Sequence, residues 1–239
     1  MQIIVPAAGD GSRFSNVGYK EPKPLINVLG KPLIKWSTDG LNIQDEPQFI
    51  FLLRKKHITE NRIDEKLKDY YKNFEIIIVD ELTEGQASTC LLAKDLINPD
   101  SELAIINCDN LFMIDLINAK NKLSIDDNSR GIVFYIAGNN PGWSYVDIDD
   151  NGYATKVEEK VMISNNATVG CYYFLKGKYF IEASEKMIKK NIRYNNEFYV
   201  SPAYNQFIAE GKKVHTWPCD FHYSLGTPEL LEKFKSLFS

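Results

Sequence analysis

Short apolar runs alternate with longer amphipathic stretches over the first half of the chain, a pattern typical of parallel strands joined by crossover helices. The apolar runs predict strands at 2–6, 48–53, 75–79 and 102–106. The amphipathic stretches predict helices at 32–41, 57–73 and 86–96, with a further helix after Asn110. Because these strands are apolar at nearly every position, we expect helices to cover both faces of the sheet.

The pattern changes after Arg130, where Asn-Pro-Gly and Asp-Asn-Gly turns separate short strands. These strands, at 132–137, 145–149 and 153–157, predict an antiparallel insertion. A strand at 169–174 returns to the main sheet, followed by helices at 180–189 and 200–209, a strand at 213–217 and a helix from Pro228. The predicted fold is therefore α/β and Rossmann-like, with a mostly parallel mixed sheet flanked by helices and a small antiparallel insertion.

Composition and charge narrow the classes of function. Apolar residues make up 44% of the 239 positions, which is enough to fill a core. A formal net charge of −4 gives no basic field for nucleic acid, so only small anions held at a local site are expected. No apolar run approaches membrane-spanning length and no leader is evident, which predicts a cytoplasmic protein without a membrane partner. The four cysteines are widely separated, which favours reduced thiols over a zinc site.

A loop of small residues follows the first predicted strand and leads to Arg13. It consists of Ala7, Ala8, Gly9, Gly11 and Ser12, with Asp10 between the glycines. Small residues let backbone N–H groups approach an anion, and open α/β sheets bind ligands at the carboxyl ends of their strands. On its own, such a loop is equally typical of an ordinary turn from strand to helix.

The next segment makes the pattern specific, because it contains Pro22-Lys23-Pro24-Leu25 and then Lys31-Pro32-Leu33-Ile34. Together with the loop, it resembles the opening motif of the sugar-phosphate nucleotidylyltransferase family. The resemblance implies that Arg13 and Lys23 bind phosphate and are catalytic. Two cations on adjacent segments suit a triphosphate that must be neutralised for attack at its α-phosphorus.

Further family elements follow in the expected order. Thr83-Glu84-Gly85-Gln86-Ala87 resembles the element whose glycine lies against the base, which implies nucleotide binding by Gly85 and Gln86. Asn107-Cys108-Asp109-Asn110 resembles the segment that carries the magnesium ligand, which implies that Asp109 is catalytic and binds Mg²⁺. A carboxylate at the end of a buried strand needs a cation or a metal as partner, in agreement with that role.

The second half resembles the acceptor-binding part of the family. The resemblance implies that Glu159 accepts hydrogen bonds from the acceptor, that Lys160 faces its phosphate, and that Gly170 lies in the following strand. We therefore expect a single domain over 1–239, with a nucleotide-binding half at 1–129 and an acceptor-binding half at 130–239. The implied ligands are a nucleoside triphosphate, a small phosphorylated acceptor and Mg²⁺. Many members of this family are oligomers, which leaves a homo-oligomer open.

The sequence contains no Ser–His or Cys–His arrangement, and the proposed chemistry needs none. A phosphate monoester has a second pKa of about 6, so the acceptor is already mostly dianionic at pH 7. The reaction requires in-line placement and neutralisation of charge on the triphosphate.

Two departures from the family pattern bear on the substrate. Ser224 stands where sugar-1-phosphate members carry a second magnesium-binding aspartate, and either Asp220 or His222 is an alternative ligand. Ser144 stands where hexose-phosphate members carry glycine, with Trp143 and Tyr145 beside it in the predicted acceptor pocket. The pattern looks closer to capsule-pathway members, including the cytidylyltransferase that acts on phosphoglutamine. We therefore predict CTP and a non-sugar acceptor.

Three alternatives stay open at this point. The first is a thymidylyl-, uridylyl- or guanylyltransferase that acts on a sugar 1-phosphate. The second is a non-catalytic nucleotide-binding regulatory protein, which the serine at position 224 keeps in view. The third is a glycosyltransferase that uses Asp147-Ile148-Asp149 as a metal motif, although these residues fall in the predicted insertion.

Overall fold

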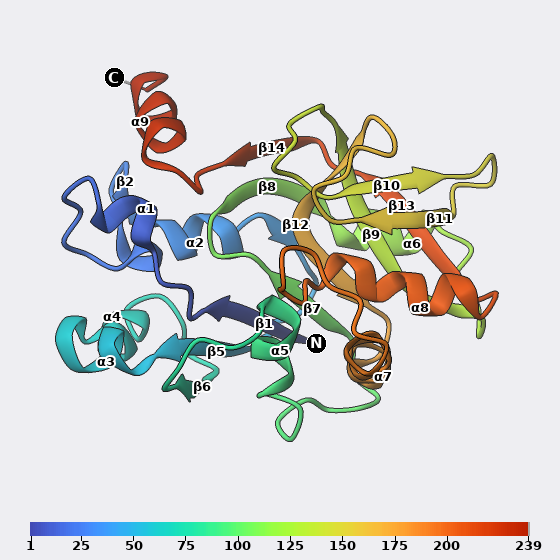
Figure 1. Ribbon diagram of the computed structural model, residues 1–239, viewed down its shortest axis with the longest axis horizontal. Coiled ribbons are helices and arrows are strands. Elements are labelled where there is room, and N and C mark those ends of the chain that lie inside the picture. Colours follow the sequence, from blue (N-terminus) through green and yellow to red (C-terminus); the bar gives the residue numbers. More distant parts are fainter. Residues whose placement is uncertain (239) are drawn as a thin grey trace.

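A nine-stranded mixed sheet runs through the computed structural model, which describes residues 1–238 (Figure 1). Seven of its strands follow the order β11-β10-β12-β7-β1-β5-β6, while β9 pairs with β12, and β13 pairs with β9. Its parallel part consists of β1 (Gln2–Ala7), β5 (Gln48–Arg54), β6 (Phe74–Val79) and β7 (Leu103–Ile106). These strands confirm the four predicted from apolar runs.

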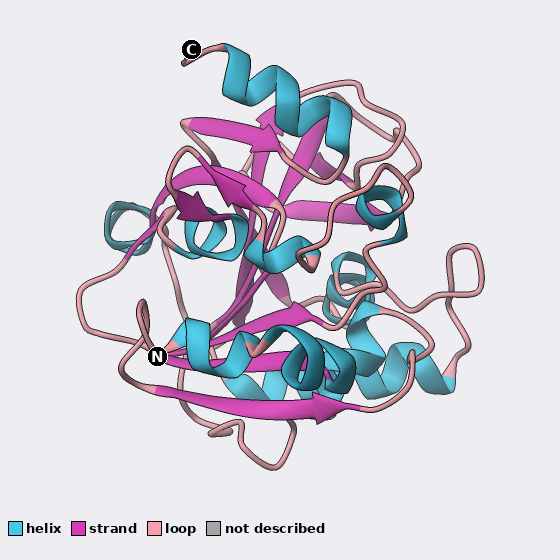
Figure 2. Cartoon of the chain, turned by 90° about the vertical axis from the view of Figure 1, so that its left-hand side faces the viewer, coloured by secondary structure: helices cyan, strands magenta, loops and turns pink. Residues whose placement is uncertain are grey.

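Successive residues of the parallel strands face opposite sides of the sheet. On one side, Ile4 and Leu52 pack in a cluster with residues of α5 (Gln86–Leu91), α7 (Gly177–Lys189) and α8 (Tyr204–Ala209). On the other, Val5 and Leu53 pack with residues of α2 (Leu33–Thr38), α4 (Ile63–Leu67) and α6 (Leu116–Lys122). Figure 2 shows the same sheet after a 90° turn, with helices on both of its sides. The alternation explains why these strands are apolar at nearly every position.

The predicted antiparallel strands are present and are part of the main sheet. β12 (Asn166–Phe174) pairs antiparallel with β7 and with β9 (Ser129–Ala137). β10 (Tyr145–Ile148) and β11 (Ala154–Glu158) extend the edge beyond β12, and β13 (Lys213–Pro218) runs parallel to β9. The sheet therefore continues from the parallel strands into the second half of the chain.

The helix predicted directly after Asn110 begins later than expected. Asn110–Asp115 forms β8, which pairs with β14 (Phe221–Ser224) and β4 (Leu41–Asn42), and α6 starts only at Leu116. In β8, Phe112 and Ile114 are buried while Met113 is exposed, which is the period of a strand. The Asp115 side chain accepts a hydrogen bond from the Asn118 backbone N–H and so caps α6.

Three other predicted helices are shorter than their amphipathic patterns, among them the helix expected at 86–96, which is α5 and ends at Leu91. The helix expected at 57–73 is divided into α3 (Lys55–Asn61) and α4, because Arg62 between them is left-handed with a φ of 52°. The helix expected at 32–41 is α2, which ends at Thr38 before β4.

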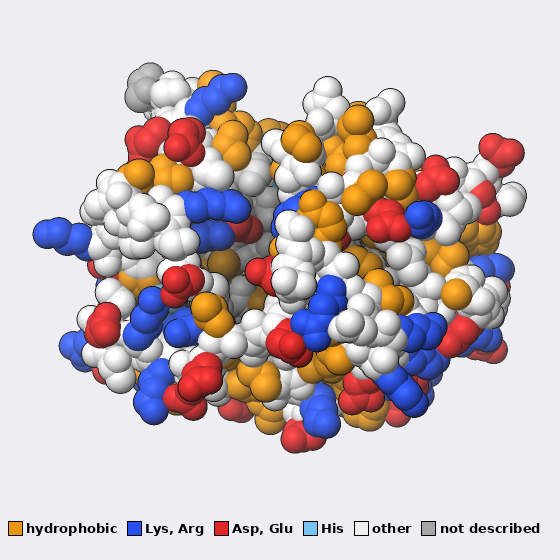
Figure 3. All heavy atoms as spheres, viewed as in Figure 1, with side chains coloured by type: hydrophobic (Ala, Val, Ile, Leu, Met, Phe, Trp, Pro, Cys, Tyr) orange, Lys and Arg blue, Asp and Glu red, His pale blue; other side chains and the backbone are white. Residues whose placement is uncertain are grey.

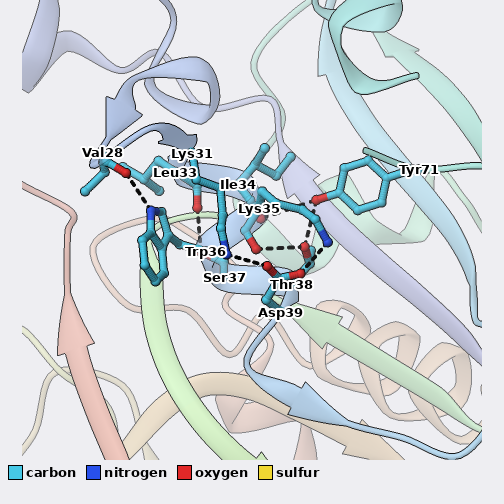
Figure 4. A network of polar contacts seen from close by, with 10 residues as sticks. All are labelled: Val28, Lys31, Leu33, Ile34, Lys35, Trp36, Ser37, Thr38, Asp39 and Tyr71. Atoms are coloured by element: carbon cyan, nitrogen blue, oxygen red, sulfur yellow. Dashed lines mark hydrogen bonds and ion pairs between the residues drawn. The ribbon is translucent and has the colours of Figure 1, made fainter. Parts of the chain in front are cut away.

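A network of polar contacts holds the segment around α2 (Figure 4). The Trp36 indole N–H donates to the Val28 carbonyl at 2.8 Å, and the Thr38 and Tyr71 hydroxyls lie 2.7 Å apart. The segment also includes the 3₁₀ turn η1 (Lys23–Leu25) and the two-residue strands β2 (Asn27–Val28) and β3 (Lys31–Pro32). These contacts fix the stretch that carries Lys23.

A third hydrophobic cluster joins the two ends of the described chain. Phe14, which lies in α1 (Ser12–Ser15), packs with Leu33 of α2 and with Leu231 and Phe234 of α9 (Pro228–Ser236). In Figure 1, α9 lies at the upper left on the same side as α1 and β2. The remaining element is the 3₁₀ turn η2 (Ser201–Ala203). Within residues 1–238, no helix combines the length and the apolar character needed to span a bilayer.

Candidate active site

A cleft of about 670 Å³ opens at the carboxyl ends of β1 and β7 and extends toward β10 and β12. In Figure 3 the face is hollowed near its centre, with basic and acidic side chains around the opening. Almost all predicted site residues line this cleft: Ala7, Ala8, Gly9, Gly11, Ser12, Arg13, Lys23, Gly85, Gln86, Asp109, Trp143, Ser144, Glu159, Lys160, Gly170, His222 and Ser224. Residues from both halves of the sequence therefore share one cavity.

The loop after β1 is a tight turn into the short helix α1. Gly11 is left-handed with a φ of 65°, and its carbonyl accepts hydrogen bonds from the backbone N–H groups of Phe14 and Ser15. Because Phe14 is buried in the third cluster, the exposed Arg13 is held at the mouth of the cleft. Arg13 forms no ion pair with any residue of the described chain, which leaves its guanidinium available to an anion.

Lys23 and Asp109 form an ion pair within the cleft, with Nζ 2.5 Å from Oδ2. Their side chains are 23% and 22% exposed, so both are partly withdrawn from water. Burial lowers the pKa of Lys23, but the Asp109 carboxylate outweighs burial, and the pKa is raised above its usual value. Lys23 therefore stays charged at neutral pH, as a phosphate-binding cation must.

The Asp109 carboxylate and the Ser224 hydroxyl lie next to each other. A β-carbon placed on Gly226 would be 2.9 Å from Asp109 Oδ2 and 3.5 Å from Ser224 Oγ, so this glycine leaves room between the two. Their neighbourhood follows from the pairing of β14 with β8, in which Ser224 stands opposite Asn110. Carboxylate and hydroxyl oxygens are hard donors that fit Mg²⁺. Since residues 1–238 hold no group of three His, Cys, Asp or Glu suited to a metal, water and triphosphate would complete its coordination.

Gly85 and Gln86 also line the cleft, and they stand at the start of α5. Gly85 has a φ of 127°, and a β-carbon there would lie 2.4 Å from the backbone nitrogen of Phe198. The Gln86 side-chain amide donates to Asn107 Oδ1 and lines the cleft beside Thr83. The Phe198 backbone, which belongs to the half predicted to bind the acceptor, thus packs against Gly85 of the predicted base-binding element.

Glu159 is buried at the end of the cleft where the acceptor was predicted to bind, and two serine hydroxyls donate to the same carboxylate oxygen, Oε2. One belongs to Ser144, which was predicted, and the other, at 2.8 Å, to Ser201. Ser201 could not be predicted as a site residue, because a serine before a proline at a helix start is usually only a turn residue. The two hydroxyls hold the carboxylate in one orientation.

Lys160 lies beside Glu159 with its Nζ 3.7 Å from Oε1. Its backbone is left-handed with a φ of 53°, and Nζ donates to the Tyr199 hydroxyl at 2.6 Å while lying 4.2 Å from the centre of that ring. Burial raises the pKa of Tyr199, so its hydroxyl stays neutral. Lys160 therefore lies in the predicted acceptor end of the cleft. Its close partner is the neutral Tyr199 hydroxyl, and its ion pair with Glu159 is a long one.

His222 also lines the cleft, with Nε2 3.0 Å from Asn110 Oδ1. Burial lowers the pKa of His222 to about 4, although the Asp109 carboxylate acts in the opposite direction. Trp143 packs edge-to-face on His222, with ring centres 5.1 Å apart. His222 is thus neutral at physiological pH and lies two positions before Ser224 in β14.

Two predicted site residues lie outside the cleft. Tyr145 is fully buried and its hydroxyl donates to the Asn140 carbonyl at 2.8 Å. Because neighbouring side chains of a strand face opposite ways, Ser144 faces the cleft and Tyr145 cannot. Asp220 is exposed and does not line the cleft, so it is excluded as the replacement metal ligand.

The Asp-x-Asp alternative also fails on position. Asp147 accepts a hydrogen bond from Thr155 across β10 and β11, and Asp149 accepts from the backbone N–H groups of Asn151 and Tyr153 in the following turn. Neither carboxylate lines the cleft. Both aspartates have local structural partners, which removes the support for a glycosyltransferase.

Comparison with known proteins decides the family, since a family model described as Nucleotidyl transferase matches residues 2–214. The chain belongs to the nucleotidyl transferase family. This nucleotidyl transferase is 26% identical over 207 residues to the bifunctional protein GlmU of Fervidobacterium nodosum, covering 84% of this chain but 42% of that protein. It thus spans less than half the length of that curated relative.

Two further proteins match over nearly their whole length. The D-glycero-alpha-D-manno-heptose 1-phosphate guanylyltransferase of Campylobacter jejuni is 22% identical, with 96% of each chain covered. The crystal structure of a nucleoside-diphosphate-sugar pyrophosphorylase from Vibrio cholerae RC9 has a TM-score of 0.79 at 23% identity, covering 98% of this chain and 99% of that one. The predicted family and α/β fold are confirmed.

Proposed function

We propose that this enzyme transfers a nucleoside monophosphate from a nucleoside triphosphate to the phosphate of a small metabolite and releases pyrophosphate. The observation that carries the proposal is the shared cleft, in which Arg13, the Lys23–Asp109 pair and Lys160 face one cavity. In this proposal, residues 1–129 of a single domain bind the nucleotide and residues 130–239 bind the acceptor.

The reaction is a displacement at the α-phosphorus. An oxygen of the acceptor phosphate forms a bond to the α-phosphorus while the bond to the oxygen that bridges to the β-phosphorus breaks, and pyrophosphate leaves with that electron pair. No proton has to be removed, because the acceptor phosphate is mostly dianionic at neutral pH. Lys23 and Arg13 neutralise the triphosphate, and Lys160 orients the acceptor phosphate. Asp109 and Ser224 would hold a magnesium ion, which when bound supplies further positive charge to the triphosphate.

For the substrates we propose CTP and a non-sugar acceptor such as phosphoglutamine, in a capsule or surface-polysaccharide pathway of the cytoplasm. The acceptor end of the cleft supports a departure from a hexose. Ser144 and Ser201 already occupy Oε2 of Glu159, so that only Oε1 is left to accept hydrogen bonds from a ligand. A carboxylate with one free oxygen suits a single donor group better than the adjacent hydroxyls of a sugar. Association into a homo-oligomer stays a prediction.

A second candidate is transfer to a sugar 1-phosphate, with a thymidylyl, uridylyl or guanylyl group. The match to the Campylobacter jejuni guanylyltransferase over 96% of both chains favours this alternative. Family membership and the Lys23–Asp109 pair both speak against the non-catalytic alternative.

The deciding experiment measures pyrophosphate release for ATP, CTP, GTP, UTP and dTTP, each with phosphoglutamine, glucose 1-phosphate, mannose 1-phosphate and a heptose 1-phosphate. Each pair is assayed with magnesium and with excess chelator. Magnesium-dependent release from CTP and phosphoglutamine alone would support the specific proposal, whereas release with a sugar 1-phosphate would replace it by the second candidate. Nucleotide binding without release from any pair would contradict transferase activity toward these acceptors.

A further inference from the structure

The two oxygens of the Asp109 carboxylate have different partners. Oδ2 lies 2.5 Å from Lys23 Nζ, whereas Oδ1 accepts a hydrogen bond from Asn110 Nδ2 at 3.1 Å. The Asn110 carbonyl oxygen, Oδ1, lies in turn 3.0 Å from Nε2 of His222. A chain of hydrogen bonds therefore runs from β14 through the first residue of β8 to the carboxylate.

The donors and acceptors in this series of hydrogen bonds can be arranged in only one way. Because the Asn110 amide donates to a carboxylate, its oxygen faces His222, and only a ring N–H can satisfy that oxygen. His222 Nε2 must therefore carry the proton, and its Nδ1 is buried without a hydrogen-bond partner in the part of the chain that the structure describes. If the amide were reversed, its carbonyl oxygen would face the Asp109 carboxylate, an arrangement of two acceptors that repel each other.

The surrounding packing leaves the amide little freedom. A β-carbon on Gly170, whose φ is 75°, would lie 2.6 Å from Asn110 Nδ2, so the amide rests against bare backbone. Trp143 packs edge-to-face on the His222 ring, with the two planes at 84°. Gly170 and Trp143 thus hold the amide and the imidazole against each other.

We infer that Asn110 and His222 are positioning residues that aim Oδ2 of Asp109 at Lys23 and at the site of the bound cation. The inference rests on the proposed role of Asp109 in holding that cation. The other oxygen donor proposed for the cation, the Ser224 hydroxyl, is neutral, so the direction of the Asp109 carboxylate matters more than it would in a site with two carboxylates. His222 acts through Asn110 and does not touch the reacting groups.

The test compares His222→Phe, which keeps a flat ring but removes the donor, with His222→Gln, which keeps an N–H, and with Asn110→Ala. Two quantities are measured: the magnesium concentration that half-saturates pyrophosphate release, and magnesium-dependent nucleotide binding without acceptor, followed by calorimetry. We expect His222→Phe and Asn110→Ala to lower the affinity for magnesium by about 10- to 100-fold, the usual effect of removing a group that orients a metal ligand. His222→Gln should recover most of that loss.

The double variant Asn110→Ala/His222→Phe is the sharpest measurement. If His222 acts only through Asn110, the double variant is no worse than Asn110→Ala alone. Independent losses that multiply in the double variant would overturn the inference, and so would unchanged magnesium binding in His222→Phe. His215→Gln serves as the control, because His215 is buried outside the cleft and pairs with Ser129.

Failure of this inference and failure of the proposed function give different results. If wild-type protein binds nucleotide with magnesium and the variants match it, only the positioning role fails. If wild-type protein shows neither magnesium-dependent binding nor pyrophosphate release, the proposed function fails first. Thermal melting of each variant identifies any that does not fold. If His222→Phe or Asn110→Ala does not fold, the magnesium dependence of His222→Gln, which keeps the hydrogen bond to Asn110, decides, and a loss as large as that expected for His222→Phe would contradict the inference.

Discussion

Gly85→Ala should lower the free energy of unfolding of this protein more than an alanine at any glycine in open space. The residue has a φ of 127° and a ψ of −179°, a region that only glycine occupies readily. An added β-carbon would also lie 2.4 Å from the backbone nitrogen and 2.6 Å from the backbone oxygen of Phe198. Those atoms cannot yield easily, because the Phe198 N–H donates to the Glu84 carbonyl at 2.7 Å and the Phe198 carbonyl accepts from Ala87 at 2.8 Å.

The expected cost combines two effects. Forcing a side chain into this backbone conformation costs about 1–3 kcal/mol. Moving Phe198 away breaks two backbone hydrogen bonds, each with a net contribution of about 1 kcal/mol. We therefore expect the free energy of unfolding to fall by about 3–5 kcal/mol. Nucleotide affinity should fall as well, because Gly85 and Gln86 line the cleft.

Urea unfolding of a matched series measures the cost. Gly211→Ala places a β-carbon at a φ of 68° with nothing within 4 Å, so it isolates the backbone effect and should cost about 1–2 kcal/mol. Gly9→Ala has neither a positive φ nor a close neighbour, so its effect on stability should be close to zero although it lies in the cleft. A Gly85→Ala protein no less stable than Gly211→Ala would refute the reasoning from Phe198.

Three further predictions follow from the site and the buried histidines. Lys23→Ala and Arg13→Ala should each lower kcat/KM for pyrophosphate release by about 10²–10³, the usual effect of removing a group that stabilises transition-state charge, and near-normal rates would exclude them. Ser224→Asp should lower the magnesium concentration for half-maximal activity, and an unchanged value in a magnesium titration would count against a ligand at that position. Burial lowers the pKa of His57, His215 and His222, so below pH 6.5 the unfolded chain binds more protons than the folded one, and stability decreases as the pH is lowered. Urea unfolding at pH 7.5 and 5.5 should show a loss of up to about 1.4 kcal/mol per pH unit for each histidine, and His215→Gln should lose its share.

The parallel strands could be predicted because burial on both faces leaves them almost purely apolar. β14 could not, because it has only four residues, Phe221–Ser224, all of them exposed or partly buried. β8 alternates in burial but not in sequence, because residues 111–114 are all apolar, and so short an apolar run fits a helix as well as a strand. The division between α3 and α4 depends on Arg62, a residue type that gives no warning of a left-handed backbone.

The gathering of Arg13, Lys23 and Asp109 in one cleft was predictable for a different reason. Arg13, Lys23 and Asp109 lie in short motifs at the ends of strands, so local sequence carries most of the information. Other parts of the cleft depend on contacts between distant segments, such as the Ser201 hydroxyl on Glu159, 42 positions earlier, and the His222 contact with Asn110, 112 positions earlier. Such contacts are set by strand register and packing, which the residue types alone do not specify. Tyr145 was misassigned by one position of strand alternation.

The third hydrophobic cluster has a consequence for synthesis of the enzyme. Phe14, beside Arg13, finds its packing partners Leu231 and Phe234 only after nearly all of the described chain has been translated. The loop between β1 and α1 would therefore stay loosely held on the ribosome until α9 has been translated. Its proposed capture of a triphosphate would become firm only once α9 has emerged and docked.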